Sequence, residues 1–122
     1  MAENDLKVIV KAKELAFHTF KLTANGERFP KKHRFCLCKR LQDKCIDIFE
    51  ALFEANRINN KTNKAERCEK ITEAITLCDE LLFLIELSMD VANLSKSSAE
   101  YWSKMVSDVK FMSIAWRKSE RQ

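Results

Sequence analysis

A dense run of basic residues lies between residues 28 and 44, where seven Lys or Arg stand against one acidic residue, Asp43. Lys and Arg side chains pair with phosphate oxygens without reading the bases of a nucleic acid. The run therefore predicts a phosphate-binding surface, with an ordinary solvated surface as the alternative. The candidate nucleic-acid-binding residues are Arg28, Lys31, Lys32, Arg34, Lys39, Arg40 and Lys44.

Pro30 suits the first turn of a helix, so the pattern predicts a helix that begins there and runs to about Asn56. Lys31 and Lys32 would then lie at the helix N-terminus, where the helix dipole disfavours positive charge. Because positive charge at this end costs stability, we expect the cations there to serve a function other than stabilising the helix.

On a helical wheel, Lys32, Lys39 and Arg40 share the side turned away from the apolar seam. No aromatic residues interleave with these cations on the exposed face, so base stacking is not predicted.

Catalytic and metal-binding patterns are weak. Two histidines lie far apart, and the single glycine, Gly26, cannot form a phosphate loop. His33, Cys36 and Cys38 could begin a metal site, but the two cysteines lie about 200° apart on a helix. We therefore expect no enzyme, no metal, no cofactor and no small-molecule substrate. Five cysteines without an export signal indicate reduced thiols in the cytoplasm, and no apolar run is long enough for a membrane.

Apolar residues at 3-4 spacing predict four helices in one domain, residues 1–122. The seams are Val8, Ala12, Leu15, Thr19 and Leu22; Cys38, Leu41, Cys45, Ile48, Leu52 and Ala55; Ile71, Ile75, Cys78, Leu82, Ile85, Met89 and Ala92; and Trp102, Met105, Val109, Met112 and Trp116. Gly26 is expected to cap the first helix, Asn63 to start the third, and a capping box from Ser97 to Glu100 to start the fourth. The second and third helices look longest, at about 30 residues. The fold class is an all-α, antiparallel up-down four-helix bundle.

The second and third predicted helices carry more apolar residues than one seam needs. A helix that is apolar nearly all round is usually buried nearly all round, so these residues predict a homo-oligomer. Scattered exposed apolar residues are the alternative. The expected interface residues are Phe35, Phe49, Phe53, Phe83, Leu84, Leu87 and Val91.

An up-down bundle would place a second basic group at the end opposite residues 28–44. Its members are Arg57, Lys61, Lys64, Arg67, Lys70, Arg117, Lys118 and Arg121.

The stretch Phe29-Pro30-Lys31-Lys32-x-Arg34-Phe35, followed by an apolar seam that ends in Glu54-Ala55-Asn56, resembles the accessory variability determinant proteins of diversity-generating retroelements. It resembles more distantly the four-helix-bundle proteins encoded in intervening sequences of bacterial 23S ribosomal RNA. Those usually carry an Asn-Ile-Ala-Glu-Gly signature late in the second helix, which this chain lacks. The resemblance implies a pentameric barrel of four-helix protomers.

The same resemblance implies a non-catalytic accessory factor that binds a reverse transcriptase, and RNA or DNA, through positive surfaces. The basic positions that match it are Lys31, Lys32 and Arg34. A rival hypothesis from another class is a structural or scaffolding bundle without a nucleic-acid role.

Overall fold

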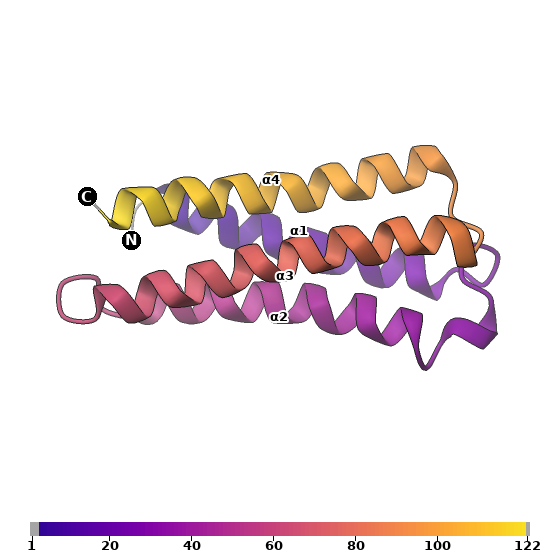
Figure 1. The fold of residues 1–122 in the computed structure, drawn as a ribbon, viewed down its shortest axis with the longest axis horizontal. Helices are drawn as coiled ribbons and strands as arrows, with labels where there is room; N and C mark the ends of the chain where they lie inside the picture. Colours follow the sequence, from indigo (N-terminus) through magenta and orange to yellow (C-terminus); the bar gives the residue numbers. More distant parts are fainter. Residues whose placement is uncertain (1–2, 122) are drawn as a thin grey trace.

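Residues 3–121 are described by a computed structural model, and within them the chain is helical with no strand. Its elements are α1 (Glu3–Ala24), the 3₁₀ turn η1 (Lys31–His33), α2 (Leu37–Arg57), α3 (Lys64–Val91) and α4 (Lys96–Glu120). Helix α1 packs on α2 and α4, and α3 packs on the same two helices, which closes a ring around one core. Figure 1 shows the four helices running side by side, with α2 and α3 joined at the end where α1 begins and α4 finishes. The predicted four-helix bundle is confirmed.

The predicted seams of α1 and α2 are buried along their whole length, because residues at 3-4 spacing return to one side of a helix. In α4, Trp102, Val109 and Trp116 are buried as expected, while Val106 and Ser113 complete the same stripe. The apolar residues of these seams pack into one hydrophobic cluster.

Helix α3 buries Ile71, Ile75, Cys78 and Ile85 of the predicted seam, but its core-facing side also includes residues outside that seam. Ala74, Leu81 and Ser88 are buried, whereas Met89 is 40% exposed and Leu82 is only half-buried. Leu84, expected at an oligomer interface, is 8% exposed and belongs to the core, so this prediction is wrong. The buried side of α3 is wider than one 3-4 seam, because residues three, four and seven apart all return to it. The sequence period alone did not give this width.

Helix α2 begins at Leu37 and not at Pro30, and it is 21 residues long. Pro30 precedes the short turn η1 instead. Lys31, Lys32 and Arg34 therefore lie outside α2, and the argument from the α2 dipole does not apply to them. The shared helical face predicted for Lys32, Lys39 and Arg40 is also wrong, because Lys32 belongs to η1.

Side chains other than the expected ones form the turns. Gly26 has no positive φ, and the Asn25 Oδ1 accepts hydrogen bonds from two backbone N–H groups beyond α1. Asn63 precedes α3 but its side chain makes no capping hydrogen bond. Helix α4 starts after Ser95, whose Oγ accepts from the Ser98 N–H at 3.2 Å, so the predicted capping box from Ser97 is wrong.

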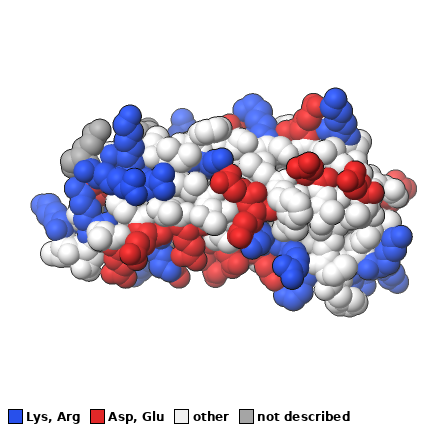
Figure 2. All heavy atoms as spheres, in the orientation of Figure 1, with Lys and Arg blue, Asp and Glu red and all other residues white. Residues whose placement is uncertain are grey.

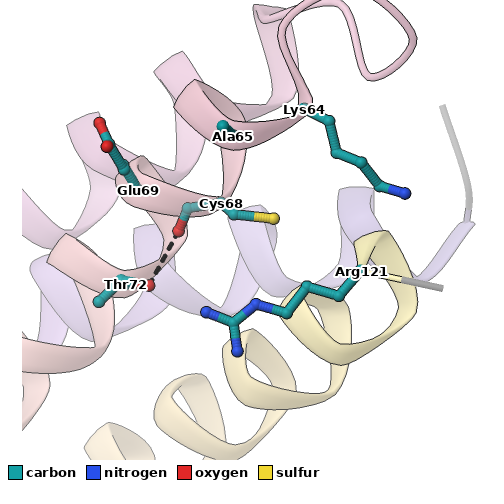
Figure 3. Close-up of a pocket in the computed structure, with 6 residues that line it drawn as sticks. All are labelled: Lys64, Ala65, Cys68, Glu69, Thr72 and Arg121. Carbon is teal, nitrogen blue, oxygen red and sulfur yellow. Dashed lines mark hydrogen bonds between the residues drawn. The ribbon is translucent and has the colours of Figure 1, made fainter.

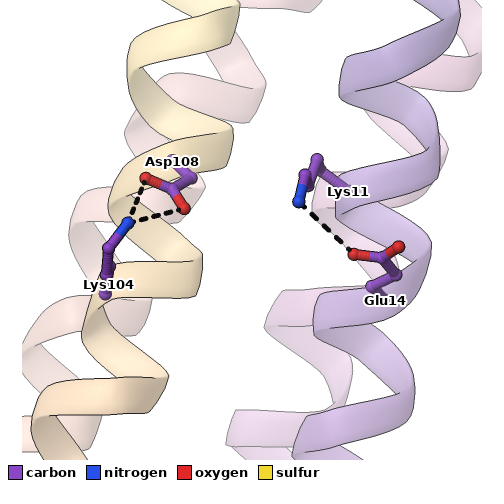
Figure 4. Close-up of polar contacts among 4 residues, drawn as sticks. All are labelled: Lys11, Glu14, Lys104 and Asp108. Carbon is purple, nitrogen blue, oxygen red and sulfur yellow. Dashed lines mark hydrogen bonds and ion pairs between the residues drawn. The ribbon is translucent and has the colours of Figure 1, made fainter.

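Ion pairs between neighbouring turns lie on the outer surface of α1 and α4. Lys11 Nζ lies 3.8 Å from a Glu14 oxygen, and Lys104 Nζ lies 3.2 Å from an Asp108 oxygen (Figure 4). Exposed pairs of this kind contribute about 0–1 kcal/mol each, so the core supplies most of the stability. None of the helices described has a stretch long and apolar enough to cross a membrane.

Candidate nucleic-acid interface

The seven predicted basic residues gather at one end of the bundle, which we call the α2 tip: Arg28, Lys31, Lys32, Arg34, Lys39, Arg40 and Lys44. They come from the α1–α2 connection, η1 and the first two turns of α2. Figure 2 shows Lys and Arg side chains densest at the left end of the view, which is the end opposite the α2 tip, with others interspersed among acidic and uncharged surface along the bundle and at the right end.

The connection that carries the tip is anchored to the bundle. Phe29 is buried and packs edge-on against Trp102 of α4, with ring centroids 6.2 Å apart. The Asn93 N–H donates to the Arg28 carbonyl at 2.9 Å, and the Asn93 side-chain amide donates to the Glu27 carbonyl at 3.1 Å. These contacts hold the backbone under the tip in place from both the α3–α4 connection and α4.

Two hollows shape the tip. Lys31 and Arg34 line a hollow of about 370 Å³ together with Gly26, Phe29 and Cys38. Its lining also includes Gln42, whose amide donates to the Thr23 hydroxyl at 2.9 Å. Two cations beside a mixed polar and apolar lining could bind one phosphate group.

The second hollow, of about 490 Å³, lies along the first turns of α2 and is called the Phe35 hollow. Its lining is Phe35, Cys36, Lys39, Arg40, Asp43, Lys44 and Asp47. Lys39 Nζ lies 2.8 Å from an Asp43 oxygen, and Lys44 Nζ lies 3.0 Å from a Glu80 oxygen. Arg40 makes no ion pair within the described part of the chain. The tip therefore holds less free charge than its composition suggests.

Phe35 changes the prediction about aromatic residues. The sequence pattern placed no aromatic residue among the exposed cations, yet Phe35 is 85% exposed and shares a hollow with Lys39, Arg40 and Lys44. The helix boundary explains the error, because Phe35 precedes α2 and is not held on the apolar side of that helix.

The opposite end of the bundle contains a third hollow, of about 650 Å³. Lys64 and Arg121 reach across it from α3 and the end of α4, with Cys68 between them (Figure 3). Not every predicted cation there is available. Arg67 is buried with Glu120, and Lys70 bridges Glu54 and Glu73.

The predicted interface residues do not form one continuous surface. Phe35, Phe53, Phe83 and Val91 are exposed, while Phe49 and Leu87 are half-buried. Phe53 stacks on Phe49 with ring centroids 5.8 Å apart.

Sequence analysis missed the contribution of α1, where Val10, Phe17 and Phe20 are exposed. Their spacing of seven and three residues places them on the outer side of α1, away from the buried seam, which could have revealed them. We define the α1–α2 apolar face as Val10, Phe17, Phe20, Ile46, Phe49 and Phe53.

The cysteine thiols of the described residues are mostly buried. Burial raises the pKa of the Cys45 thiol to about 11 and that of Cys78 to about 12, so both stay protonated at neutral pH. Cys36 is exposed, whereas Cys38 and the other cysteines are buried. No three His, Cys, Asp or Glu side chains gather closely enough to hold a metal ion among the residues described.

The fold and the positions of the basic and apolar residues define a small helical-bundle protein. No protein-family model matches the chain, and no curated protein matches its sequence. A crystal structure of a protein with unknown function, from the S23 ribosomal protein family of Bacteroides thetaiotaomicron, superposes on it with a TM-score of 0.82 at 17% identity. The superposition covers 94% of this chain and 98% of that one, so the two share the four-helix fold along nearly their whole length.

Proposed function

We propose that this protein is a non-catalytic accessory factor of a diversity-generating retroelement, which binds nucleic acid and the element's reverse transcriptase through basic surfaces. The sequence resemblance around Phe29–Phe35 supplies the retroelement context. The observation that carries the nucleic-acid role is the α2 tip, where seven cations from three consecutive segments lie at one end of a rigid bundle.

The charge distribution within the tip supports binding to the backbone of a nucleic acid. Lys32, Arg34 and Arg40 make no ion pair within the described residues, so a phosphate can pair with each without displacing a carboxylate. Contacts of this kind release counterions and make affinity fall steeply with salt. They carry no base sequence, so binding is expected to be largely blind to sequence.

The test is a fluorescence-anisotropy titration of labelled single-stranded RNA at several salt concentrations. Replacing Lys32, Arg34 and Arg40 together by Gln should flatten the slope of log affinity against log salt by about two units, because each lost contact removes about 0.7. A matched control replaces Lys11, Lys13 and Lys104, which lie on α1 and α4 away from the tip, and should leave most of the slope intact. An equal effect of both triple variants would refute a localised site.

The reverse-transcriptase contact needs its own experiment. A pull-down with the polymerase encoded beside this gene should recover the protein at low salt, and the tip variant should be recovered less well than the control variant. The absence of a reverse-transcriptase gene and an imperfect repeat pair from the neighbourhood of the gene would argue against the retroelement role.

We also propose that the protomers assemble into a cyclic homo-oligomer, a pentamer by the resemblance. Two apolar regions support a ring: the α1–α2 apolar face, and helix α3, where Phe83 and Val91 are exposed and Leu87 is half-buried. Helices α1 and α3 are diagonal in the bundle, so these surfaces point in different directions. A head-to-tail contact between two different surfaces forms a ring when its rotation closes and an open filament when it does not, whereas a two-fold dimer uses one surface twice.

Light scattering tests the assembly. The wild type should have several times the protomer mass of 14.3 kDa. Phe53→Glu should lower that mass, because a charge buried in an apolar contact costs several kcal/mol. Phe111→Glu is the matched control, since Phe111 is also exposed but lies on α4. A monomeric wild type at micromolar concentration would refute the ring.

A scaffolding bundle without a nucleic-acid role is the second candidate. It is favoured by the ion pairs of Lys39 with Asp43 and of Lys44 with Glu80, which neutralise part of the tip. No RNA binding by the wild type at low salt would establish this candidate over the first.

A further inference from the structure

Phe35 is the most exposed large apolar side chain of the described residues, at 85%. Burying a Phe side chain typically stabilises a protein by about 1.5–3 kcal/mol relative to leaving it in water. At Phe35 the fold gains little of this stabilisation. An aromatic ring held in solvent at a structured end of the bundle is therefore a candidate contact for a binding partner.

The surroundings of Phe35 indicate which partner it contacts. The Phe35 hollow is lined mainly by charged side chains: Lys39, Arg40, Asp43, Lys44 and Asp47. The centre of a protein–protein interface is normally depleted of charged residues. Ile46, the nearest α2 member of the α1–α2 apolar face, lies about 14 Å along the helix from Leu37, because nine residues separate the two. Phe35 precedes Leu37, so more than two helical turns separate it from that member of the face.

An aromatic ring flanked by cations matches the chemistry of a single-stranded nucleic acid, which offers an unpaired base for stacking and phosphates for pairing. The charges around the ring are divided between positive and negative groups. Arg40 is available to a phosphate, whereas Asp43 and Asp47 repel one. A strand in the Phe35 hollow should therefore place phosphates toward Arg40 and a base over the ring.

We propose that Phe35 is a stacking platform for one unpaired base of single-stranded RNA or DNA, with Arg40 binding a neighbouring phosphate. This inference rests on the proposed nucleic-acid function and adds a preference for single strands. The bases of a duplex are stacked on one another and cannot lie on a protein ring without being unpaired. Binding to duplex should therefore not depend on Phe35.

The experiment compares a labelled 20-nucleotide single strand with a duplex of the same length, in RNA and in DNA. Phe35→Ala should weaken binding to the preferred single strand about 5- to 150-fold, the range expected for loss of one stacked base. It should change duplex binding less than twofold. Phe35→Trp should keep single-strand affinity, because Trp also stacks. Phe111→Ala is the matched control, an equally drastic truncation of an exposed Phe on α4, outside the proposed assembly surfaces.

A spectroscopic readout reports stacking directly. The native Trp102 and Trp116 are buried, so the indole of Phe35→Trp would be the accessible one among the described tryptophans. Its fluorescence should be quenched by the single strand and not by an abasic chain of the same length, which carries phosphates alone. Equal quenching by both chains would overturn the stacking role.

The outcomes separate this inference from the proposed function. Suppose that the triple variant of Lys32, Arg34 and Arg40 loses binding while Phe35→Ala binds single strands normally. This result would refute stacking and leave the proposed function standing. Equal weakening of single-strand and duplex binding by Phe35→Ala would also refute stacking. A smaller oligomer mass of Phe35→Ala would assign the ring to self-association instead. A wild type that binds neither single strand nor duplex at low salt would refute both proposals.

Discussion

Replacing Arg67 by Met should destabilise the bundle more than any single substitution at the α2 tip. Arg67 is a buried cation on α3: its side chain is 8% exposed, and that of its partner Glu120 is 10% exposed. Nη2 lies 3.1 Å from Glu120 Oε1, and Nη1 donates to the Ile58 carbonyl at 2.9 Å. The guanidinium also lies over the Trp116 ring, at 5.1 Å from the centroid. These contacts join the start of α3 to the end of α4 and to the α2–α3 connection.

The magnitude follows from what remains after the substitution. Met fills much of the volume of Arg67 but leaves Glu120 as a nearly buried carboxylate without its cation, although Trp116 Nε1 still donates to it at 3.0 Å. Removing one partner of a buried pair costs about 3–5 kcal/mol. For 122 residues the entropy of unfolding is about 0.26 kcal/mol/K, so the melting temperature should fall by about 12–20 °C.

The assay is thermal and urea denaturation followed by circular dichroism, at one fixed protein concentration because self-association would shift the midpoint. The double variant Arg67→Met with Glu120→Met should recover most of the loss, since neither charge then remains buried. Lys104→Met is a control for an exposed pair and should cost less than about 1 kcal/mol. A fall in melting temperature below about 4 °C for Arg67→Met would refute the reasoning, because it would mean that the pair behaves as a solvated one.

Two further predictions concern titratable groups. Burial, with added repulsion from Arg28 and Lys21, lowers the pKa of His18 below its usual 6.5, so the unfolded chain takes up a proton at a higher pH than the folded chain. The free energy of unfolding should therefore fall as the pH drops through 6.5 toward that lowered pKa. Urea denaturation at several pH values should show this fall, and the fall should be smaller in His18→Gln. For the thiols, a labelling reagent at pH 8 should modify the exposed Cys36 quickly, and Cys45 and Cys78 only on unfolding, because burial raises the pKa of these two thiols to about 11 and about 12. Rapid labelling of Cys45 or Cys78 in native Cys36→Ser would contradict this.

The sequence by itself determined the four helices and most of the core. Apolar side chains at 3-4 spacing lie on one side of a helix whatever its surroundings, so the stripes of α1 and α2 could be found locally. The clustering of cations in residues 28–44 was equally visible, because it depends on composition alone. The sequence did not locate the start of α2, since Pro30 fits both the first turn of an α-helix and the entry to a 3₁₀ turn.

Tertiary structure decided what lies between the helices. Leu84 and Val91 lie seven residues apart on nearly the same side of α3, yet Leu84 is buried while Val91, the last residue of the helix, is exposed. Packing in the tertiary structure decides which part of that side is covered. Arg67 could not be distinguished from the surface cations around it until Glu120 and Trp116, about fifty residues away, were brought to its side. The sequence predicted Phe35 as an oligomer-interface residue, and only the tertiary structure showed that it lies among charged side chains of the first turns of α2. In each case the energy depends on contacts between distant segments, which a local pattern does not contain.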